Sequence, residues 1–249
     1  PHYPVCPLPE FHGKGDCGAY GEFVIETDFH VGRIMKFLKE SDLDENTIIV
    51  FTSDNGPEKS WKGRIEEYGH DSSDIYRGGK RDIFEGGHRV PFIVRWPGGI
   101  MQPGRTWDSP VGQTDLLATF AELIGTKLPD SAGEDSDSFA KVLIDLDDVE
   151  NRLPLINHGN DGRYSITEGN WKLILPSAKS KGGLHDLSKD PGEAKNLLRQ
   201  FPEIAQKLEA KATAIILNGR TTQGKAQAND TGHWEDLGWI TAEEYNAKK

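Results

Sequence analysis

The sequence has few cysteines, no long hydrophobic run and no excess of positive charge. Its 249 residues include 29 Lys and Arg against 40 Asp and Glu, a formal net charge of −11, which argues against nucleic acid as a partner. No apolar run approaches the ~20 residues of a membrane-spanning helix, so we expect no membrane span. The two cysteines, Cys6 and Cys17, are close enough for a local disulfide in an oxidising compartment but do not require one. This favours an exported protein.

The first part of the sequence predicts an α/β arrangement. Residues 22–40 carry apolar side chains at helical spacing, and the β-branched run 47–51 predicts a strand buried on both faces of a largely parallel sheet. A second strand is expected at 90–96. A helix with Thr114 as its N-cap is expected to end at Gly125.

After residue 151 the pattern changes to short strand candidates separated by turn residues. They lie at 153–156, 163–167, 171–175 and 184–187. Residues 202–217 have the apolar spacing of a helix that could cover one face of such a sheet. We therefore divide the chain into an α/β part, 1–150, and a small α+β subdomain, 151–249, with a four-stranded antiparallel sheet, a helix and a polar tail.

The first candidate site follows the strand at 47–51. Asp54 and Asn55 offer a carboxylate and an amide oxygen side by side, and Ca²⁺ and Mg²⁺ prefer such hard oxygen ligands. In open α/β sheets, ligands bind beyond the carboxyl ends of the strands. The alternative is that Asp-Asn-Gly at 54–56 is an ordinary turn sequence.

A glycine-rich segment, 76–91, and a histidine near the start of the chain supply further candidates. Glycines allow the backbone to approach a ligand closely, and Lys80 would place a positive charge near an anionic oxygen. The alternative is a solvated loop in which Lys80 pairs with Asp82 or Glu85. The imidazole of His2 can donate a proton near neutral pH, although a histidine near a chain end is by default exposed and idle.

The polar stretch 58–89 is too long for an ordinary connection, and we interpret it as a functional loop. Trp61, Tyr68 and His70 lie in it, where they would either contact a sugar or aryl group or pack the loop onto the scaffold. His88 is a further candidate for substrate contact.

Taken in order, these segments resemble the C-terminal half of the type I sulfatases, the formylglycine-dependent arylsulfatase family of the alkaline-phosphatase superfamily. The segments that carry the resemblance are 2–4, 31–34, 52–56, 79–80, 84–91, 96–98, 114–117, 169–174 and 184–193. The resemblance implies part of an alkaline-phosphatase-like mixed sheet flanked by helices, followed by a small C-terminal antiparallel sheet with a covering helix.

The resemblance also implies roles for single residues. Asp54 and Asn55 match ligands of a Ca²⁺ ion, for which Mg²⁺ is an alternative, and Lys80 matches the lysine that contacts the sulfate. His2 matches the histidine that would protonate the leaving alcohol. The implied reaction is hydrolysis of a sulfated small molecule or glycan to alcohol and inorganic sulfate, with a hydrated formylglycine aldehyde attacking sulfur. The implied location is an exported compartment: periplasmic, extracellular or lysosome-like.

The cysteines depart from the family pattern. Neither Cys6 nor Cys17 stands in the C/S-x-P-x-R motif from which formylglycine is made. In the family, that motif and the first metal-binding acids belong to an N-terminal half. We therefore expect the 249 residues of this chain to be inactive alone and to need the N-terminal half as a partner. Two alternatives stay open: a phosphodiester or phosphonate hydrolase of the same superfamily, and a non-catalytic carbohydrate-binding remnant.

Overall fold

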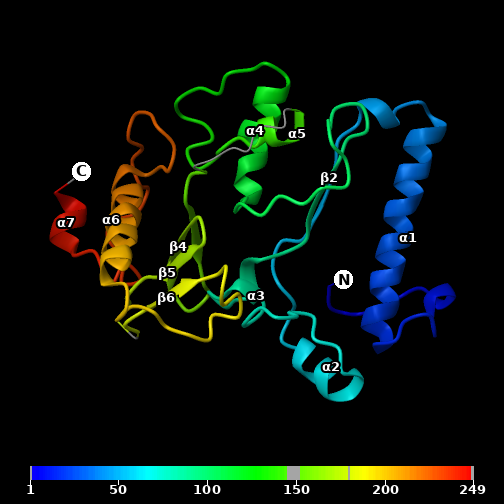
Figure 1. The fold of residues 1–249 in the computed structure, drawn as a ribbon, viewed down its shortest axis with the longest axis horizontal. Helices are drawn as coiled ribbons and strands as arrows, with labels where there is room; N and C mark the ends of the chain where they lie inside the picture. Colours follow the sequence, from blue (N-terminus) through cyan, green and yellow to red (C-terminus); the bar gives the residue numbers. More distant parts are fainter. Residues whose placement is uncertain (1, 145–151, 179, 248–249) are drawn as a thin grey trace. The chain divides into compact units, whose positions relative to one another are not determined.

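The computed structural model describes residues 2–144, 152–178 and 180–247 (Figure 1). The chain divides into two compact units, one of residues Pro1–Asp74 and Val90–Ile100, the other of residues Ile75–Arg89 and Met101–Lys249. The predicted division between 1–150 and 151–249 falls outside the described residues and stays a prediction. None of the helices in the described ranges is both long and apolar enough to cross a membrane.

The first unit contains one long helix and one pair of strands. Its elements are the 3₁₀ turns η1 (Pro9–Phe11) and η2 (Asp44–Asn46), the helices α1 (Gly18–Glu40) and α2 (Trp61–Tyr68), and the strands β1 (Ile49–Thr52) and β2 (Phe92–Arg95). The two strands pair antiparallel, with Ile49 opposite Arg95 and Thr52 opposite Phe92. Asp44 and Arg95 add a two-pronged ion pair, with N–O distances of 2.6 and 2.9 Å.

Two predictions for this unit are wrong. Strand β1 was expected to be buried in a largely parallel sheet, but it is only half-buried and its partner in the described chain is antiparallel. A β-branched run indicates an apolar environment and carries no information on the direction of the neighbouring strand. The stretch 58–89 was expected to be a loop, but it contains α2 and the short helix α3 (Glu85–His88).

The first unit has very little apolar core among the described residues. Among the residues of this unit that the structure describes, Phe11 is the only buried hydrophobic side chain. Its ring packs edge-on against Phe29 with a centroid separation of 5.4 Å. Helix α1 leaves five large apolar side chains exposed: Val24, Ile25, Phe29, Ile34 and Phe37. The helix therefore carries more apolar surface than this unit covers.

The second unit contains the predicted four-stranded sheet and its covering helix. Its strands are β3 (Leu155–His158), β4 (Tyr164–Glu168), β5 (Trp171–Ile174) and β6 (Gly183–Asp186), paired antiparallel in that order. Its helical elements, besides α3, are η3 (Gln113–Asp115), α4 (Leu116–Leu123), α5 (Ala140–Ile144), α6 (Pro202–Asn218) and α7 (Ala242–Asn246). Each strand lies within two residues of its predicted position, so the prediction of the meander is confirmed.

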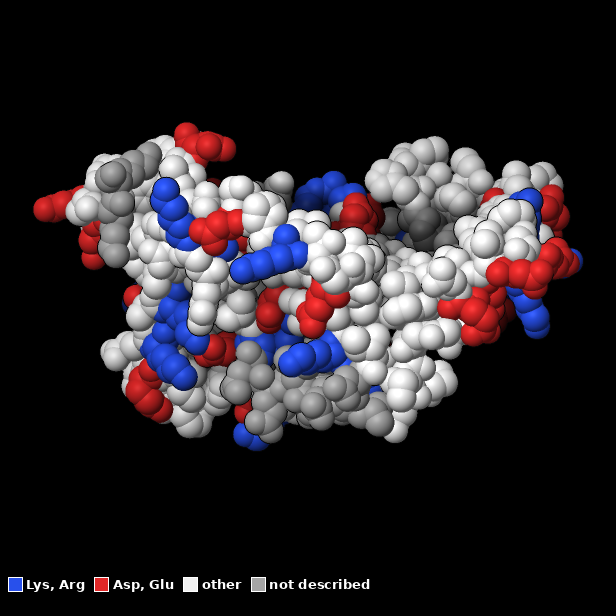
Figure 2. Space-filling model, turned by 90° about the horizontal axis from the view of Figure 1, so that it is seen from above, with Lys and Arg blue, Asp and Glu red and all other residues white. Residues whose placement is uncertain are grey.

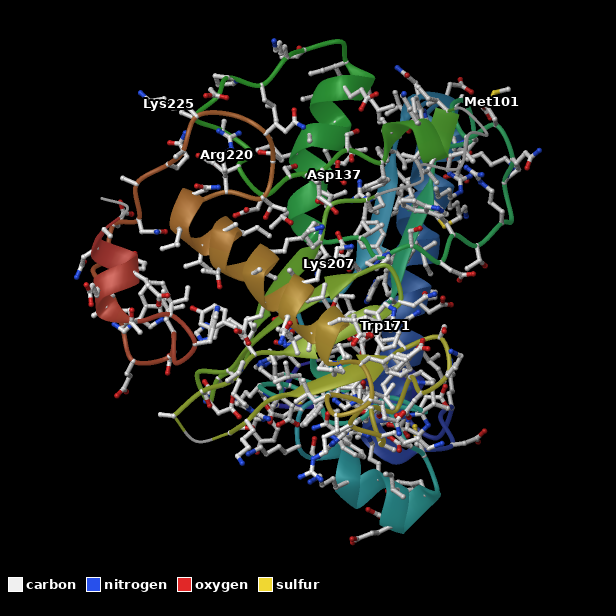
Figure 3. The ribbon with its side chains drawn as sticks, turned by 60° about the vertical axis from the view of Figure 1, so that its left-hand side comes forward. Met101, Asp137, Trp171, Lys207, Arg220 and Lys225 are labelled. Carbon is white, nitrogen blue, oxygen red and sulfur yellow. The ribbon has the colours of Figure 1, made fainter. Side chains whose placement is uncertain are left out.

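Helix α6 packs its apolar face on the sheet, as Figures 1 and 3 show. Leu208 and Ala212 lie one turn apart on that face and are fully buried. They meet a layer of sheet residues: Ile166, Leu173, Leu175 and Leu184. Pro202 opens the helix and Gly219, in the left-handed conformation, closes it. This layer is the main hydrophobic core of the unit.

The predicted N-cap of the helix after residue 114 is wrong by one position. Thr114 lies inside η3, and the side chain of Asp115 accepts the N–H of Gly112 at 2.8 Å. Asp115 thus closes the η3 turn from its third position. In the first turn of α4 it is the Ser136 hydroxyl that accepts the Ala118 N–H, at 2.8 Å.

The C-terminal tail, for which the sequence showed no pattern, is packed. Leu237, Ile240 and Tyr245 are almost fully buried and form a second apolar cluster. The loop after α6 also binds the acidic segment near Asp130. Arg220 donates to the Asp130 carbonyl oxygen at 3.0 Å and the Lys225 N–H to its carboxylate at 2.8 Å, and Figure 3 shows both residues in this loop.

Charged side chains of both signs are interspersed on the face shown in Figure 2. Lys36 and Glu40, both exposed on α1, form an ion pair of neighbouring opposite charges. The negative net charge of the chain is therefore not gathered into one patch on that face.

Candidate functional site

The turn after β1 presents two oxygen ligands next to each other. The Ser53 hydroxyl donates to the Asn55 carbonyl oxygen at 3.1 Å, and the Asn55 side-chain nitrogen donates to the Gly56 carbonyl oxygen at 2.9 Å. Because its nitrogen donates to the Gly56 carbonyl, the Asn55 amide directs its oxygen away from that carbonyl. The Asp54 carboxylate is exposed. These two side chains suit a Ca²⁺ or Mg²⁺ ion.

Two ligands are only part of a calcium site. Ca²⁺ takes about six to eight oxygen ligands. In the described ranges, no group of three or more His, Cys, Asp or Glu side chains could hold a metal ion. The pair therefore fits a divalent cation as one side of a coordination shell, and further ligands have to come from other residues.

His2 lies exposed near the start of the chain. Its Nδ1 is 2.7 Å from the Tyr3 carbonyl oxygen, and since a carbonyl only accepts, Nδ1 carries the proton. The other ring atom, Nε2, is then the position at which the imidazole gains or gives up a proton.

The three candidates on and after α2 differ in their surroundings. Trp61 begins the helix and is half-buried, with the Lys62 ammonium 5.8 Å from its ring. The Tyr68 hydroxyl packs so closely on Gly18 that a Cβ there would lie 2.6 Å from it. A hydrogen bond with Glu67 raises the pKa of the Tyr68 phenol. Tyr68 therefore packs α2 onto the start of α1, whereas His70 is half-buried after the helix end.

Arg64 is a buried residue that the sequence patterns missed. Its guanidinium stacks on the Tyr20 ring at 3.8 Å and donates to Ser60 and Ser72 at 3.0 to 3.3 Å. Ser60 lies one helical turn before Arg64, which was the only local signal. The residue fixes α2 to α1 and so positions Trp61.

In the second unit, Lys80 lies on a tight turn. The Asp82 N–H donates to the Gly79 carbonyl oxygen at 2.9 Å, and the Asp82 carboxylate accepts the Gly79 N–H at 3.0 Å. Arg81 has a φ of 82°, a left-handed conformation that costs free energy for a residue with a Cβ. Lys80 itself is half-buried, so the turn presents its side chain from a defined backbone.

Two glycines explain how closely α3 and this turn approach. A Cβ at Gly86 would lie closer than 3.0 Å to the Gly78 carbonyl oxygen, and one at Gly87 equally close to the Asp82 carbonyl oxygen. The Gly86 N–H donates to the Arg77 carbonyl oxygen at 2.7 Å. Only residues without a side chain allow this contact.

A buried ion cluster lies beneath α3. The Lys172 ammonium contacts the Glu85 carboxylate at 2.9 Å and the Glu193 carboxylate at 3.1 Å. Glu193 also accepts the Glu85 N–H at 2.6 Å. Lys172 and Glu193 are completely buried. Burial raises the pKa of Glu193, and the Lys172 charge opposes that rise.

His88 ends α3 next to the same cluster. Its ring is hydrogen-bonded to the backbone of Asp82, and burial followed by the nearby Lys172 charge lowers its pKa. The buried Nε2 has no hydrogen-bond partner in the described part of the chain. Its surroundings therefore favour the neutral form of His88, which contacts the turn carrying Lys80.

The predicted site residues thus fall in both units. His2, Asp54, Asn55, Trp61, Tyr68 and His70 lie in the first unit, and Lys80 and His88 lie in the second. Within the second unit, Lys80 and His88 share one loop. The predicted convergence of His2, Asp54, Asn55 and Lys80 on one sulfate group stays a prediction.

Comparison with known proteins identifies the family of this chain. The family described as Sulfatase matches residues 4–126, and the one described as N-sulphoglucosamine sulphohydrolase, C-terminal, matches residues 77–217. An N-acetylgalactosamine-6-O-sulfatase of Bacteroides thetaiotaomicron is 35% identical over 225 residues, which cover 83% of this chain and 43% of that protein. Human arylsulfatase A is 30% identical over 255 residues, which cover 91% of this chain and 49% of that protein.

Solved structures agree in fold. A chain solved in a study of glycosaminoglycan metabolism by Bacteroides thetaiotaomicron has a TM-score of 0.76 and 33% identity, covering 86% of this chain and 48% of that one. The phosphonate monoester hydrolase of Agrobacterium radiobacter, at 19% identity, has a TM-score of 0.58 and covers 80% of this chain and 40% of that one, a likeness of fold alone. The chain spans about half the length of the relatives it matches. It has the predicted alkaline-phosphatase-like fold, and it belongs to the type I sulfatase family.

Proposed function

We propose that this chain is the C-terminal portion of a sulfatase, which hydrolyses sulfate esters to an alcohol and inorganic sulfate. The observation that carries the proposal is the Sulfatase match over residues 4–126, which runs through both the Asp54–Asn55 pair and the loop of Lys80. The activity is assigned to the whole protein, of which this chain supplies one part.

The residues of this chain would bind the sulfate and assist the departure of the alcohol. A sulfate ester is anionic and its leaving oxygen gains charge in the transition state, so the Lys80 ammonium is placed to bind the sulfuryl oxygens. Only interactions that strengthen in the transition state raise the chemical rate. The Nε2 atom of His2 is the proton donor that would neutralise the departing alkoxide.

Two further groups are part of the proposal. Asp54 and Asn55 would hold one side of a Ca²⁺ ion, with Mg²⁺ as the alternative, and such a cation supplies Lewis-acid stabilisation of the sulfate charge. A formylglycine in the N-terminal half would supply the nucleophile. Neither Cys6 nor Cys17, both free thiols in the structure, has the sequence context for that role.

The exposed apolar face of α1 supports a requirement for the N-terminal half. Phe11 is the only hydrophobic side chain that the described residues of the first unit bury, while Phe29, Ile34 and Phe37 remain exposed on α1. A large amount of exposed apolar surface is typical of an interaction surface. We propose that the N-terminal half covers it, and that residues 1–249 alone have no turnover.

The relatives support a proposal for the substrate and the compartment. The names of the Bacteroides proteins refer to a galactosamine 6-O-sulfate and to glycosaminoglycans, which favours a sulfated glycan over a small aryl sulfate as the natural substrate. An exported compartment, whether periplasmic, extracellular or lysosome-like, is consistent with such a substrate.

The test compares ester classes with the full-length protein. We expect hydrolysis of 4-nitrophenyl sulfate, and of a sulfated glycosaminoglycan oligosaccharide, to exceed that of the matching phosphate and phosphonate esters. Preference for a phosphonate or phosphodiester would favour the hydrolase alternative. Oligosaccharide binding without hydrolysis of any ester would favour the carbohydrate-binding remnant.

A further inference from the structure

We propose that the buried ion cluster of Lys172, Glu85 and Glu193 is a positioning device for the loop that carries Lys80. The inference rests on the proposed function for the role of Lys80 in sulfate binding. The anchoring of the loop by the cluster can be tested independently of that role. The three residues are positioning residues, because they act through the loop.

A continuous series of contacts leads from the cluster to Lys80. The cluster fixes Glu85 at both its side chain and its backbone N–H. Gly86 and Gly87 follow directly and lie in closest contact with the carbonyl oxygens of Gly78 and Asp82. These carbonyls bracket the turn of Lys80. A shift of Glu85 would therefore move the turn, because contacts this close leave the backbone no room to adjust.

Segments next to the four-stranded sheet also hold the loop that carries Lys80. The Arg81 carbonyl oxygen accepts the N–H of Asn160 at 3.0 Å, between β3 and β4. Arg77 donates to the Glu193 carbonyl oxygen at 3.2 Å. Ile83 is completely buried and packs against Gly159. These contacts attach the loop to the turn between β3 and β4 and to the segment after β6.

The chemistry of the cluster favours positioning over stability alone. Burying a charge costs free energy, and well-packed apolar residues often replace a buried ion pair without loss of stability. Charge-assisted hydrogen bonds, such as the one from Lys172 to Glu85 at 2.9 Å, are short and strong, and the same ammonium lies 3.1 Å from the Glu193 carboxylate. One ammonium between two carboxylates therefore restricts the position and orientation of α3 more than an apolar contact would.

The first experiment measures amide hydrogen exchange of residues 77–89 in the full-length protein. Glu193→Gln keeps the shape of the side chain and an acceptor for the Glu85 N–H but removes the charge. Lys172→Met removes the ammonium. We expect exchange in 77–89 to rise on the order of tenfold or more in both variants, with little change in β4. Lys189→Met, which removes an ammonium that is 82% exposed and pairs with Asp186, is the matched control.

The outcome of this experiment decides the anchoring. Faster exchange confined to 77–89 supports it. Unchanged exchange in 77–89, or a uniform rise across β4 as well, overturns it in favour of a general structural role. Where Lys172→Met fails to fold, Glu193→Gln alone decides.

The second experiment is a double-mutant cycle on kcat/KM for 4-nitrophenyl sulfate. Misplacing a catalytic group by about 1 Å can cost about 100-fold in rate, and we expect Glu193→Gln to approach that loss. In a Lys80→Ala background the same substitution should cost almost nothing, because the loop no longer carries the ammonium. Equal losses with and without Lys80 would overturn the inference.

Failure of the proposed function gives a different result. If Lys80→Ala leaves sulfate hydrolysis unchanged, or if the wild-type protein hydrolyses no sulfate ester, the role of Lys80 falls. The hydrogen-exchange comparison still decides whether the ion cluster anchors the loop.

Discussion

Replacing Asp115 by Asn is expected to destabilise the second unit strongly. The Asp115 side chain is 1% exposed and pairs with Arg152 at 2.5 Å, and the Arg152 side chain is 5% exposed. Asp115 also accepts the N–H groups of Gly112 and Asp137, at 2.8 and 2.9 Å. An amide has no net charge, so the substitution leaves a buried guanidinium without its nearest counter-ion.

The structure sets the size of this effect. Removing one partner of a buried ion pair costs about 3–5 kcal/mol. Asp137 remains 3.0 Å from Arg152 but is more exposed, so we expect the lower end, about 3 kcal/mol. The entropy of unfolding grows with chain length, so in a full-length protein about twice as long as this chain 1 kcal/mol shifts Tm by about 1–2 °C, which gives a fall of about 3–6 °C.

Thermal and urea unfolding of the full-length protein are the assays for Asp115→Asn. The control is Glu40→Gln, which removes an ion pair exposed on both sides and should cost at most about 0.5 kcal/mol. A Tm for Asp115→Asn no lower than that of Glu40→Gln would show that the Asp115–Arg152 pair does not hold η3 and α4 in place.

Three further predictions concern the site and the buried His185 of β6. Asp54→Ala should remove most of the activity and weaken calcium retention, because it deletes a charged ligand; unchanged calcium content by elemental analysis would contradict the assignment. His2→Ala should slow esters of poor, high-pKa leaving alcohols more than activated aryl sulfates, which need little protonation, and equal losses in kcat for both would remove the proton-donor role. His185→Gln should destabilise the protein less at acidic pH than at neutral pH, as measured by urea unfolding.

Elements with a strong local pattern were predictable from the sequence. Strands β3 to β6 alternate with turn residues, and α6 has apolar side chains at helical spacing between Pro202 and Gly219, so hydrophobic periodicity located them within two residues. Helix α2 was not predictable, because its sequence is mostly polar and contains Gly63. The direction of β1 depends on a strand more than forty positions later, which no local pattern encodes.

In the candidate site, too, some residues could be predicted from the sequence and others could not. Asp54, Asn55 and Lys80 stand in short motifs whose chemistry can be recognised without coordinates. The ion cluster could not be recognised, because Glu85 lies 87 positions from Lys172 and 108 from Glu193. Of the two carboxylates near Lys80 in the sequence, Asp82 accepts the Gly79 N–H and Glu85 pairs with Lys172. Which charges meet is decided by the packing of the β3–β6 subdomain against the loop.

The pH dependence of His185→Gln follows from the surroundings of the imidazole. Burial, with a further contribution from Lys172, lowers the pKa of His185 below its usual 6.5, although a hydrogen bond with the Lys195 backbone opposes the shift. The folded state then binds fewer protons than the unfolded state, so stability is fully present above pH 6.5 and is lost as the pH falls towards the lowered pKa.

Buried carboxyl groups with a raised pKa change the stability with pH in the opposite direction to His185. Burial raises the pKa values of Glu193 and Asp115, so their folded forms retain protons that the unfolded forms have lost. The total stability therefore mixes both signs, but the difference between the wild-type protein and His185→Gln cancels the carboxyl groups. Measured between about pH 5 and 8, that difference in the free energy of unfolding should shrink as the pH falls below 6.5. A difference that stays constant or grows on the acid side would show that His185 is not held neutral by its burial.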